Sequence, residues 1–129
     1  MTTSSKPRKR FSGRPLALLA ESRMLGIRAG GEHRFTGIWF VMIGSRVFVR
    51  PYYDKASGWH RVFRKDPRGA IRLGEKEFPV RARVIRSERL FDAVDAAYAE
   101  KYDTQASQKW VRGFRLARRR KTTTELLPD

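Results

Sequence analysis

The sequence predicts a small, mainly β protein: a six-stranded antiparallel barrel with two or three short helices at its margins. Three observations carry this prediction. The chain has 129 residues, of which 40% are hydrophobic, and this suits one domain with one core. Short runs of alternating or β-branched apolar residues recur along the chain, separated by glycine turns. A single long segment has the spacing of an amphipathic helix.

The chain is expected to fold as one domain over residues 15–129, preceded by a disordered basic tail over residues 1–14. The tail is rich in Ser, Thr, Lys and Arg, a composition that buries too little apolar surface to fold by itself. Directly after it, Pro15 to Ser22 has the apolar content of a short helix, and proline is well tolerated in a first helical turn.

The strands are expected to pair as antiparallel hairpins. Residues 35–43 are apolar on both faces, which predicts a central strand, and Gly44 turns the chain into the next strand. Gly74 forms the turn of a second hairpin. The last strand is rich in threonine and leucine, residues that suit a half-buried pleated surface. The six strands are expected at residues 25–29, 35–43, 47–52, 70–73, 80–85 and 122–127.

Capping residues predict two further helices. Ser57 precedes apolar residues at helical spacing up to Phe63. Ser87 precedes the clearest amphipathic helix of the sequence, which reaches about Tyr102. Residues 106–114 are weakly helical. These elements complete a barrel with appended helices.

Composition excludes several classes of function. The chain has no cysteine, so it has no disulfides, zinc–thiolate sites or thiol nucleophiles, and its two histidines lack metal-ligand spacing. No apolar run approaches the roughly 20 residues of a membrane-spanning helix, and the N-terminus lacks the apolar core of a secretory signal. We therefore expect a cytoplasmic protein that is neither a protease, a metalloenzyme nor inserted in a membrane.

The net charge of +16 is the most prominent compositional feature. Such an excess favours an anionic partner, for example a phosphate group or a nucleic acid. The alternative is compositional drift, because arginine strongly outnumbers lysine, as it does in arginine-favouring genomes.

The segment 50–64 is the strongest candidate for a binding site. Here a strand ends, a loop carries Lys55 and Ser57, and a helix opens with Trp59 and Arg61. Unpaired backbone N–H groups and nearby cations favour a phosphate, and the aromatic side chains offer flat apolar surface for a planar ring. The alternative is that Ser57 only caps the helix, Trp59 belongs to the core and the cations are solvated. Spacing alone does not decide between the two.

The order of these elements resembles the FMN-binding split-barrel superfamily, and within it an uncharacterised family near the deazaflavin-dependent nitroreductases. The resemblance extends over about residues 24–128. It depends on R-x-T-G-I-W-F-V from Arg34, R-V-F-V-R from Arg46, S-G-W-H-R-V-F-R-K-D-P from Ser57 and T-T-E-L-L-P from Thr123.

The resemblance implies a six-stranded split barrel, a homodimer, and a nitroreductase-like oxidoreductase that uses FMN or an 8-hydroxy-5-deazaflavin, with the cofactor phosphate near the strand-to-helix loop. One departure is that Trp59 stands where FMN-binding members commonly have a lysine. By position, the resemblance implies these cofactor-binding residues: Thr36, Trp39, Arg50, Lys55, Ser57, Trp59 and Arg61.

Two other functions stay open on the sequence. The first is a nucleic-acid-binding barrel, in which the basic runs 6–10 and 118–121 form an electrostatic groove and aromatic side chains stack on bases. The second is a barrel that retains no cofactor and serves as a dimerisation or scaffold module.

Overall fold

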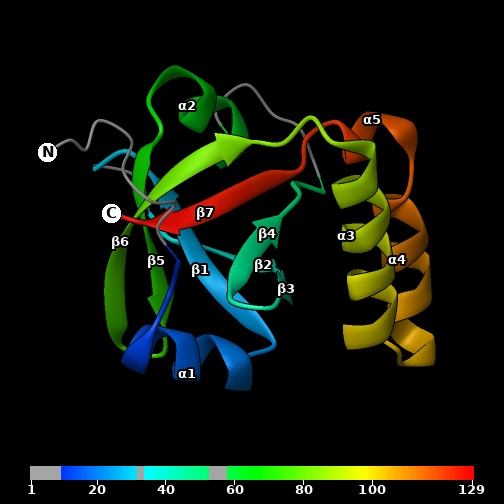
Figure 1. The fold of residues 1–129 in the computed structure, drawn as a ribbon, viewed down its shortest axis with the longest axis horizontal. Coiled ribbons are helices and arrows are strands. Elements are labelled where there is room, and N and C mark those ends of the chain that lie inside the picture. The colour runs from blue at the N-terminus through cyan, green and yellow to red at the C-terminus, as the bar shows by residue number, and fades with distance from the viewer. Residues whose placement is uncertain (1–9, 32–33, 53–57) are drawn as a thin grey trace, which may run out of the picture.

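The protein is described from a computed structural model, which covers residues 10–31, 34–52 and 58–129. Its fold is mainly β: a nearly closed antiparallel barrel with helices packed around it (Figure 1). The strands are β1 (Met24–Ala29), β2 (Thr36–Trp39), β3 (Val41–Ile43), β4 (Arg46–Val49), β5 (Arg68–Leu73), β6 (Lys76–Val84) and β7 (Thr124–Pro128). The helices are α1 (Gly13–Glu21), α2 (Trp59–Lys65), α3 (Glu88–Lys101), η1 (Gln105–Ser107), α4 (Gln108–Phe114) and α5 (Ala117–Arg120).

The two edges of the sheet are adjacent in sequence. The strand order is β2-β1-β5-β6-β7-β4-β3, so β2 and β3 lie at opposite edges although Phe40 alone separates them. The predicted central strand over residues 35–43 therefore exists as two edge strands, which is why the barrel has seven strands and not six. The sheet curves until its edges meet, and the chain itself joins them.

The two predicted hairpins are confirmed. β3 pairs with β4 through a turn at Gly44, and β5 pairs with β6 through a turn at Gly74. Both glycines have a positive φ, 60° and 62°, a conformation that residues with a side chain rarely adopt.

The molecule has two apolar clusters that share the wall of the barrel. One fills the barrel, and the other lies between the barrel and the helices α3 and α4. Val47 and Val49 of β4 point into the barrel, and Phe48 between them points toward the helices; all three are fully buried. This matches the alternation expected of a strand.

Three helices fall close to their predicted bounds, while the helical content is higher than predicted. Ser87 caps α3 by accepting a hydrogen bond from the Leu90 backbone N–H. α5 was not predicted, because its basic sequence has no apolar face. At the other end, α1 begins at Gly13 and Phe11 is buried, so packed structure extends into the predicted tail; residues 1–9 lie outside the described part.

Side chains of α3 hold the chain where it passes from β2 to β3. The Tyr102 hydroxyl accepts a hydrogen bond from the Phe40 N–H (3.1 Å) and lies 3.0 Å from the Phe40 carbonyl oxygen. The Lys101 ammonium donates to the same carbonyl. One turn earlier, the Tyr98 hydroxyl accepts from the Arg50 backbone N–H. The backbone groups that the strand break removes from the sheet are thus paired with the helix.

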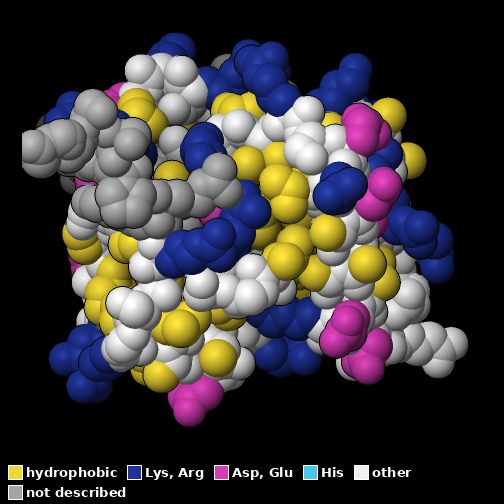
Figure 2. Space-filling model, in the orientation of Figure 1, with side chains coloured by type: hydrophobic (Ala, Val, Ile, Leu, Met, Phe, Trp, Pro, Cys, Tyr) yellow, Lys and Arg dark blue, Asp and Glu magenta, His cyan; other side chains and the backbone are white. Residues whose placement is uncertain are grey.

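Basic side chains are spread over the face seen in Figure 2, and acidic side chains gather on the side occupied by α3. Among the described residues, no helix is both long and apolar enough to cross a membrane.

Candidate functional site

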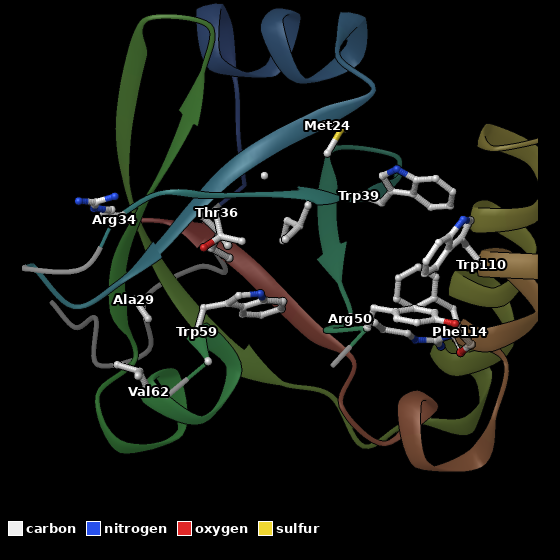
Figure 3. A pocket seen from close by; sticks show the side chains of 15 residues that line it. Met24, Ala29, Arg34, Thr36, Trp39, Arg50, Trp59, Val62, Trp110 and Phe114 are labelled. Carbon is white, nitrogen blue, oxygen red and sulfur yellow. Dashed lines mark hydrogen bonds between the residues drawn. The ribbon is translucent and has the colours of Figure 1, made fainter. Parts of the chain in front are cut away.

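A cleft of about 740 Å³ opens beside β2, between the barrel wall and the helices α2 and α4 (Figure 3). This volume falls within the range of small-molecule sites. Its lining is Met24, Ile27, Ala29, Arg34, Thr36, Gly37, Ile38, Trp39, Arg50, Tyr52, Gly58, Trp59, Val62, Trp110 and Phe114.

All three tryptophans of the chain line this cleft. Trp39 ends β2, Trp59 begins α2 and Trp110 lies on α4. Tyr52 and Phe114 add two further rings. Three elements that are distant in sequence therefore each contribute an indole to one cavity, which makes a surface suited to a planar ring.

The aromatic end of the cleft is built from rings that support one another. Trp39 stacks on Tyr102, with ring centroids 4.0 Å apart and an interplanar angle of 3°. Tyr52 meets Trp110 and Phe114 edge-on, at centroid distances of 4.7 and 5.5 Å. Trp110 and Phe114 are four residues apart and so share one face of α4. This wall is fixed by packing before any ligand enters.

Tyr52 is itself held from behind by α4 and α5. The Arg119 guanidinium lies 4.0 Å from the Tyr52 ring centroid, and Arg119 donates to the carbonyl oxygens of Tyr52 (2.9 Å) and Gly113 (3.0 Å). A Cβ atom at Gly113 would lie 2.8 Å from the Tyr52 ring. Glycine at this position allows Tyr52 to pack directly on the helix.

Arg50 lines the cleft, but its guanidinium is committed to the protein. The side chain is 1% exposed and donates to Asp95, to the Thr123 hydroxyl (2.8 Å) and to the carbonyl oxygens of Phe91 and Phe114. Burial lowers the pKa of Arg50, and the hydrogen bond to Asp95 opposes that shift. Arg50, directly after β4, therefore connects α3, α4 and the residue that precedes β7.

The remaining predicted site residues are distributed unevenly. Thr36, Trp39 and Trp59 line the cleft. Arg61 is exposed on α2 and is not part of the lining, and Lys55 and Ser57 lie outside the described residues. Trp110 and Phe114 were not predicted as site residues, although their spacing places them on one face of a helix.

The cleft is positively charged. Its charged lining residues in the described part of the chain are Arg34 and Arg50, and no carboxylate is among them. Behind Trp39, burial raises the pKa of Tyr102 to about 12, and burial together with Arg23 lowers the pKa of Lys101 to about 8. Among the described residues, no group of histidine, aspartate or glutamate could hold a metal ion.

The comparison with solved structures bears on the fold. The structure is similar to the crystal structure of the conserved hypothetical protein Rv2991 from Mycobacterium tuberculosis, with a TM-score of 0.60 and 16% sequence identity; the match covers 95% of this chain and 83% of that one. No curated protein matches the sequence. Residues 22–126 match the model of a family described as "Uncharacterized protein conserved in bacteria (DUF2255)".

Proposed function

The chain belongs to the bacterial family DUF2255, and we propose that this member is an oxidoreductase of the split-barrel type that holds a flavin or deazaflavin in its aromatic cleft. The observation that carries the proposal is the convergence of Trp39, Trp59 and Trp110 on one cavity of about 740 Å³. A fused planar ring would bury its faces against these indoles.

The cleft supplies the contacts that such a cofactor needs. Thr36 offers a hydroxyl on the barrel wall, and Trp39 and Trp110 offer ring surface at one end. We propose that Lys55, Ser57 and Arg61, the candidates that the family resemblance implies, take part in holding the cofactor phosphate. FMN and a phosphorylated 8-hydroxy-5-deazaflavin both have the planar ring and the anionic side chain that these contacts would bind.

The absence of an acid–base pair in the described lining is compatible with this function. A flavin or deazaflavin carries the hydride chemistry when bound, so the protein needs to bind it, orient it and exclude water. Here the stacked Trp39–Tyr102 pair and the Tyr52–Phe114 wall would fix the orientation of the ring.

A titration tests the proposal directly. Purified protein is titrated with FMN and with 8-hydroxy-5-deazaflavin while cofactor fluorescence is followed. Binding with a Kd below roughly 100 μM, equivalent to about 5 kcal/mol, supports the proposal, and failure to bind either molecule at that concentration overturns it.

A matched pair of aromatic substitutions locates the binding. Trp110→Leu removes a ring from the cleft and should weaken binding about tenfold. Phe35→Leu is the control, because Phe35 does not line the cleft and packs instead against Arg28 and Arg72. Equal losses in both variants would place the cofactor elsewhere. Chromatography with light scattering on the same samples tests the proposed homodimer.

The nucleic-acid alternative has weaker support. A nucleic-acid surface needs cations that are available to phosphates. On the strands, Arg28, Arg46, Arg81 and Arg83 are each within 4 Å of a carboxylate of the chain itself.

A further inference from the structure

We infer that Arg34 selects ligands with an anionic substituent and thereby gives the cleft a direction: the ring lies at the end formed by Trp39 and Trp110, and the anionic group lies at the Arg34 end. The inference rests on the proposed function and adds to it the ligand class and the residue that discriminates it. In the sequence, Arg34 was notable only as the first residue of the motif R-x-T-G-I-W-F-V.

The two arginines of the cleft differ in whether their guanidinium groups are available to a ligand. Of the two arginines that line the cleft, Arg50 is 1% exposed and donates to four groups of the protein. Arg34 is exposed, and no described residue forms an ion pair or hydrogen bond with it. Arg34 is thus the described cleft cation whose guanidinium can turn to a ligand.

The position of Arg34 limits the shape of a ligand that contacts both ends of the cleft. Figure 3 shows Arg34 at one end of the cleft and Trp39, Trp110 and Phe114 at the other, with Thr36 between them. Along an extended chain of about 3.3 Å per residue, the five steps from Arg34 to Trp39 span about 16 Å. A ligand that reaches both ends must be elongated, with a flat part and a charged part.

The charges of the described cleft lining also favour an anion near Arg34. No aspartate or glutamate belongs to the described lining, whereas other arginines of the barrel strands have acidic partners, such as Arg28 with Glu77 and Arg68 with Asp66. A cation at the mouth of an apolar cleft without a counter-charge attracts an anion more strongly than the same cation in open solvent. A planar guanidinium can also bind a phosphate or carboxylate through two hydrogen bonds.

Pairs of probes that differ in the phosphorylated side chain isolate this contribution. FMN is compared with riboflavin, and the 8-hydroxy-5-deazaflavin ring is compared with and without its phosphorylated side chain. Their Kd values are measured for the unmodified protein and for Arg34→Gln, Arg34→Lys and Arg64→Ala. Arg64 is the matched control because it is exposed on α2 and does not line the cleft.

Arg34→Gln should weaken binding of the phosphorylated probes about ten- to a hundredfold and leave the neutral probes unchanged. Arg34→Lys should lose less, because the positive charge remains, and Arg64→Ala should bind both probes as the unmodified protein does. Equal binding of charged and neutral probes, or an Arg34→Gln variant that keeps the preference for phosphate, overturns the inference while the proposed function stands. If no probe of either pair binds, the proposed function itself fails.

Discussion

At the scale of single residues, two neighbouring side chains at the end of α3 hold the backbone at Phe40, where the chain joins the two edges of the sheet. Tyr102 pairs with the backbone of Phe40, and its ring supports Trp39 in the cleft. Lys101 donates to the Phe40 carbonyl and lies 3.3 Å from the centroid of the Phe40 ring. Both residues therefore connect the closure of the sheet to the wall of the candidate site.

Tyr102→Phe should destabilise the protein by about 1–3 kcal/mol. The substitution keeps the ring that stacks on Trp39 but leaves the buried Phe40 N–H without its acceptor. Urea unfolding monitored by circular dichroism measures the change. Glu100→Gln, at an exposed position on the same helix, is the control; a Tyr102→Phe variant as stable as this control would contradict the prediction.

Lys101→Met should change how stability depends on pH. Burial lowers the pKa of Lys101 from 10.5 to about 8 in the folded chain, so between these values the unfolded chain binds more protons. The contribution of Lys101 to the unfolding free energy therefore rises with pH over this window. Compared with Lys101→Met, the unmodified protein should gain stability between about pH 8 and about pH 10.5. A difference between the two proteins that stays constant with pH would refute this.

The hydrogen-bond partners of Arg50 could not be predicted from the sequence. Its position after a strand and before an aromatic loop suits a cofactor contact. The groups that hold its guanidinium are 41 to 73 residues away in sequence. Local sequence patterns do not predict partners at such separations. The cleft positions of Thr36, Trp39 and Trp59, by contrast, follow from local strand and helix patterns.

At the scale of elements, the structure depends on connections between helices and strand ends. Arg50 links β4 to α3 through Asp95 and to β7 through Thr123. The break at Phe40 was not predicted from the sequence. The run 35–43 contains no proline, and the Tyr102 hydroxyl that pairs with the interrupted backbone lies 62 residues further on.

Asp95→Asn should cost about 3 kcal/mol of stability, because it leaves the buried Arg50 guanidinium without its counter-charge. Asp92→Asn is the matched control on the same helix. The Asp92 side chain is 75% exposed and its pairing with Arg120 should contribute less than about 1 kcal/mol. Thermal unfolding of both variants gives the comparison, and equal midpoints would show that Arg50 does not depend on Asp95.

Gly69→Ala should destabilise the barrel by more than about 3 kcal/mol. A Cβ atom there would lie 2.3 Å from the Arg28 carbonyl oxygen of the neighbouring strand and 2.7 Å from the Phe63 ring of α2, so backbone and core would both have to move. Gly31→Ala is the control, since a Cβ atom at Gly31 meets no atom of the described residues within 4 Å. Denaturant unfolding that gives similar values for the two variants would argue against this close packing.

At the scale of the whole molecule, charge is the dominant property. The net charge is +16, and many acidic side chains in the described part of the chain pair with basic ones, such as Glu77 with Arg28 and the buried Glu125 with Arg46. The charge total could be read from the sequence, but its division into paired and available cations could not, because pairing depends on which strands are neighbours. The mainly β class and the helix at residues 88–101 were predictable because strands and amphipathic helices each have a local periodic signal.

Salt should weaken binding of a phosphorylated probe and not of its neutral counterpart. Raising the ionic strength from about 0.1 M to about 1 M shortens the screening length from about 10 Å to about 3 Å, which removes most of the attraction from the molecule's charge. FMN association, measured by stopped flow, should slow markedly, while riboflavin association should not. Equal salt dependence of the two would mean that the net charge has no part in recognition.

The convergence of every indole on one cavity gives this protein a built-in optical signal. Because Trp39, Trp59 and Trp110 are the complete set, no distant tryptophan contributes a constant background to the emission. Any molecule that enters the cleft should alter the brightness or the colour of the ultraviolet emission of the unlabelled chain. A compound library can therefore be screened by fluorimetry alone, without deciding beforehand what the natural occupant is.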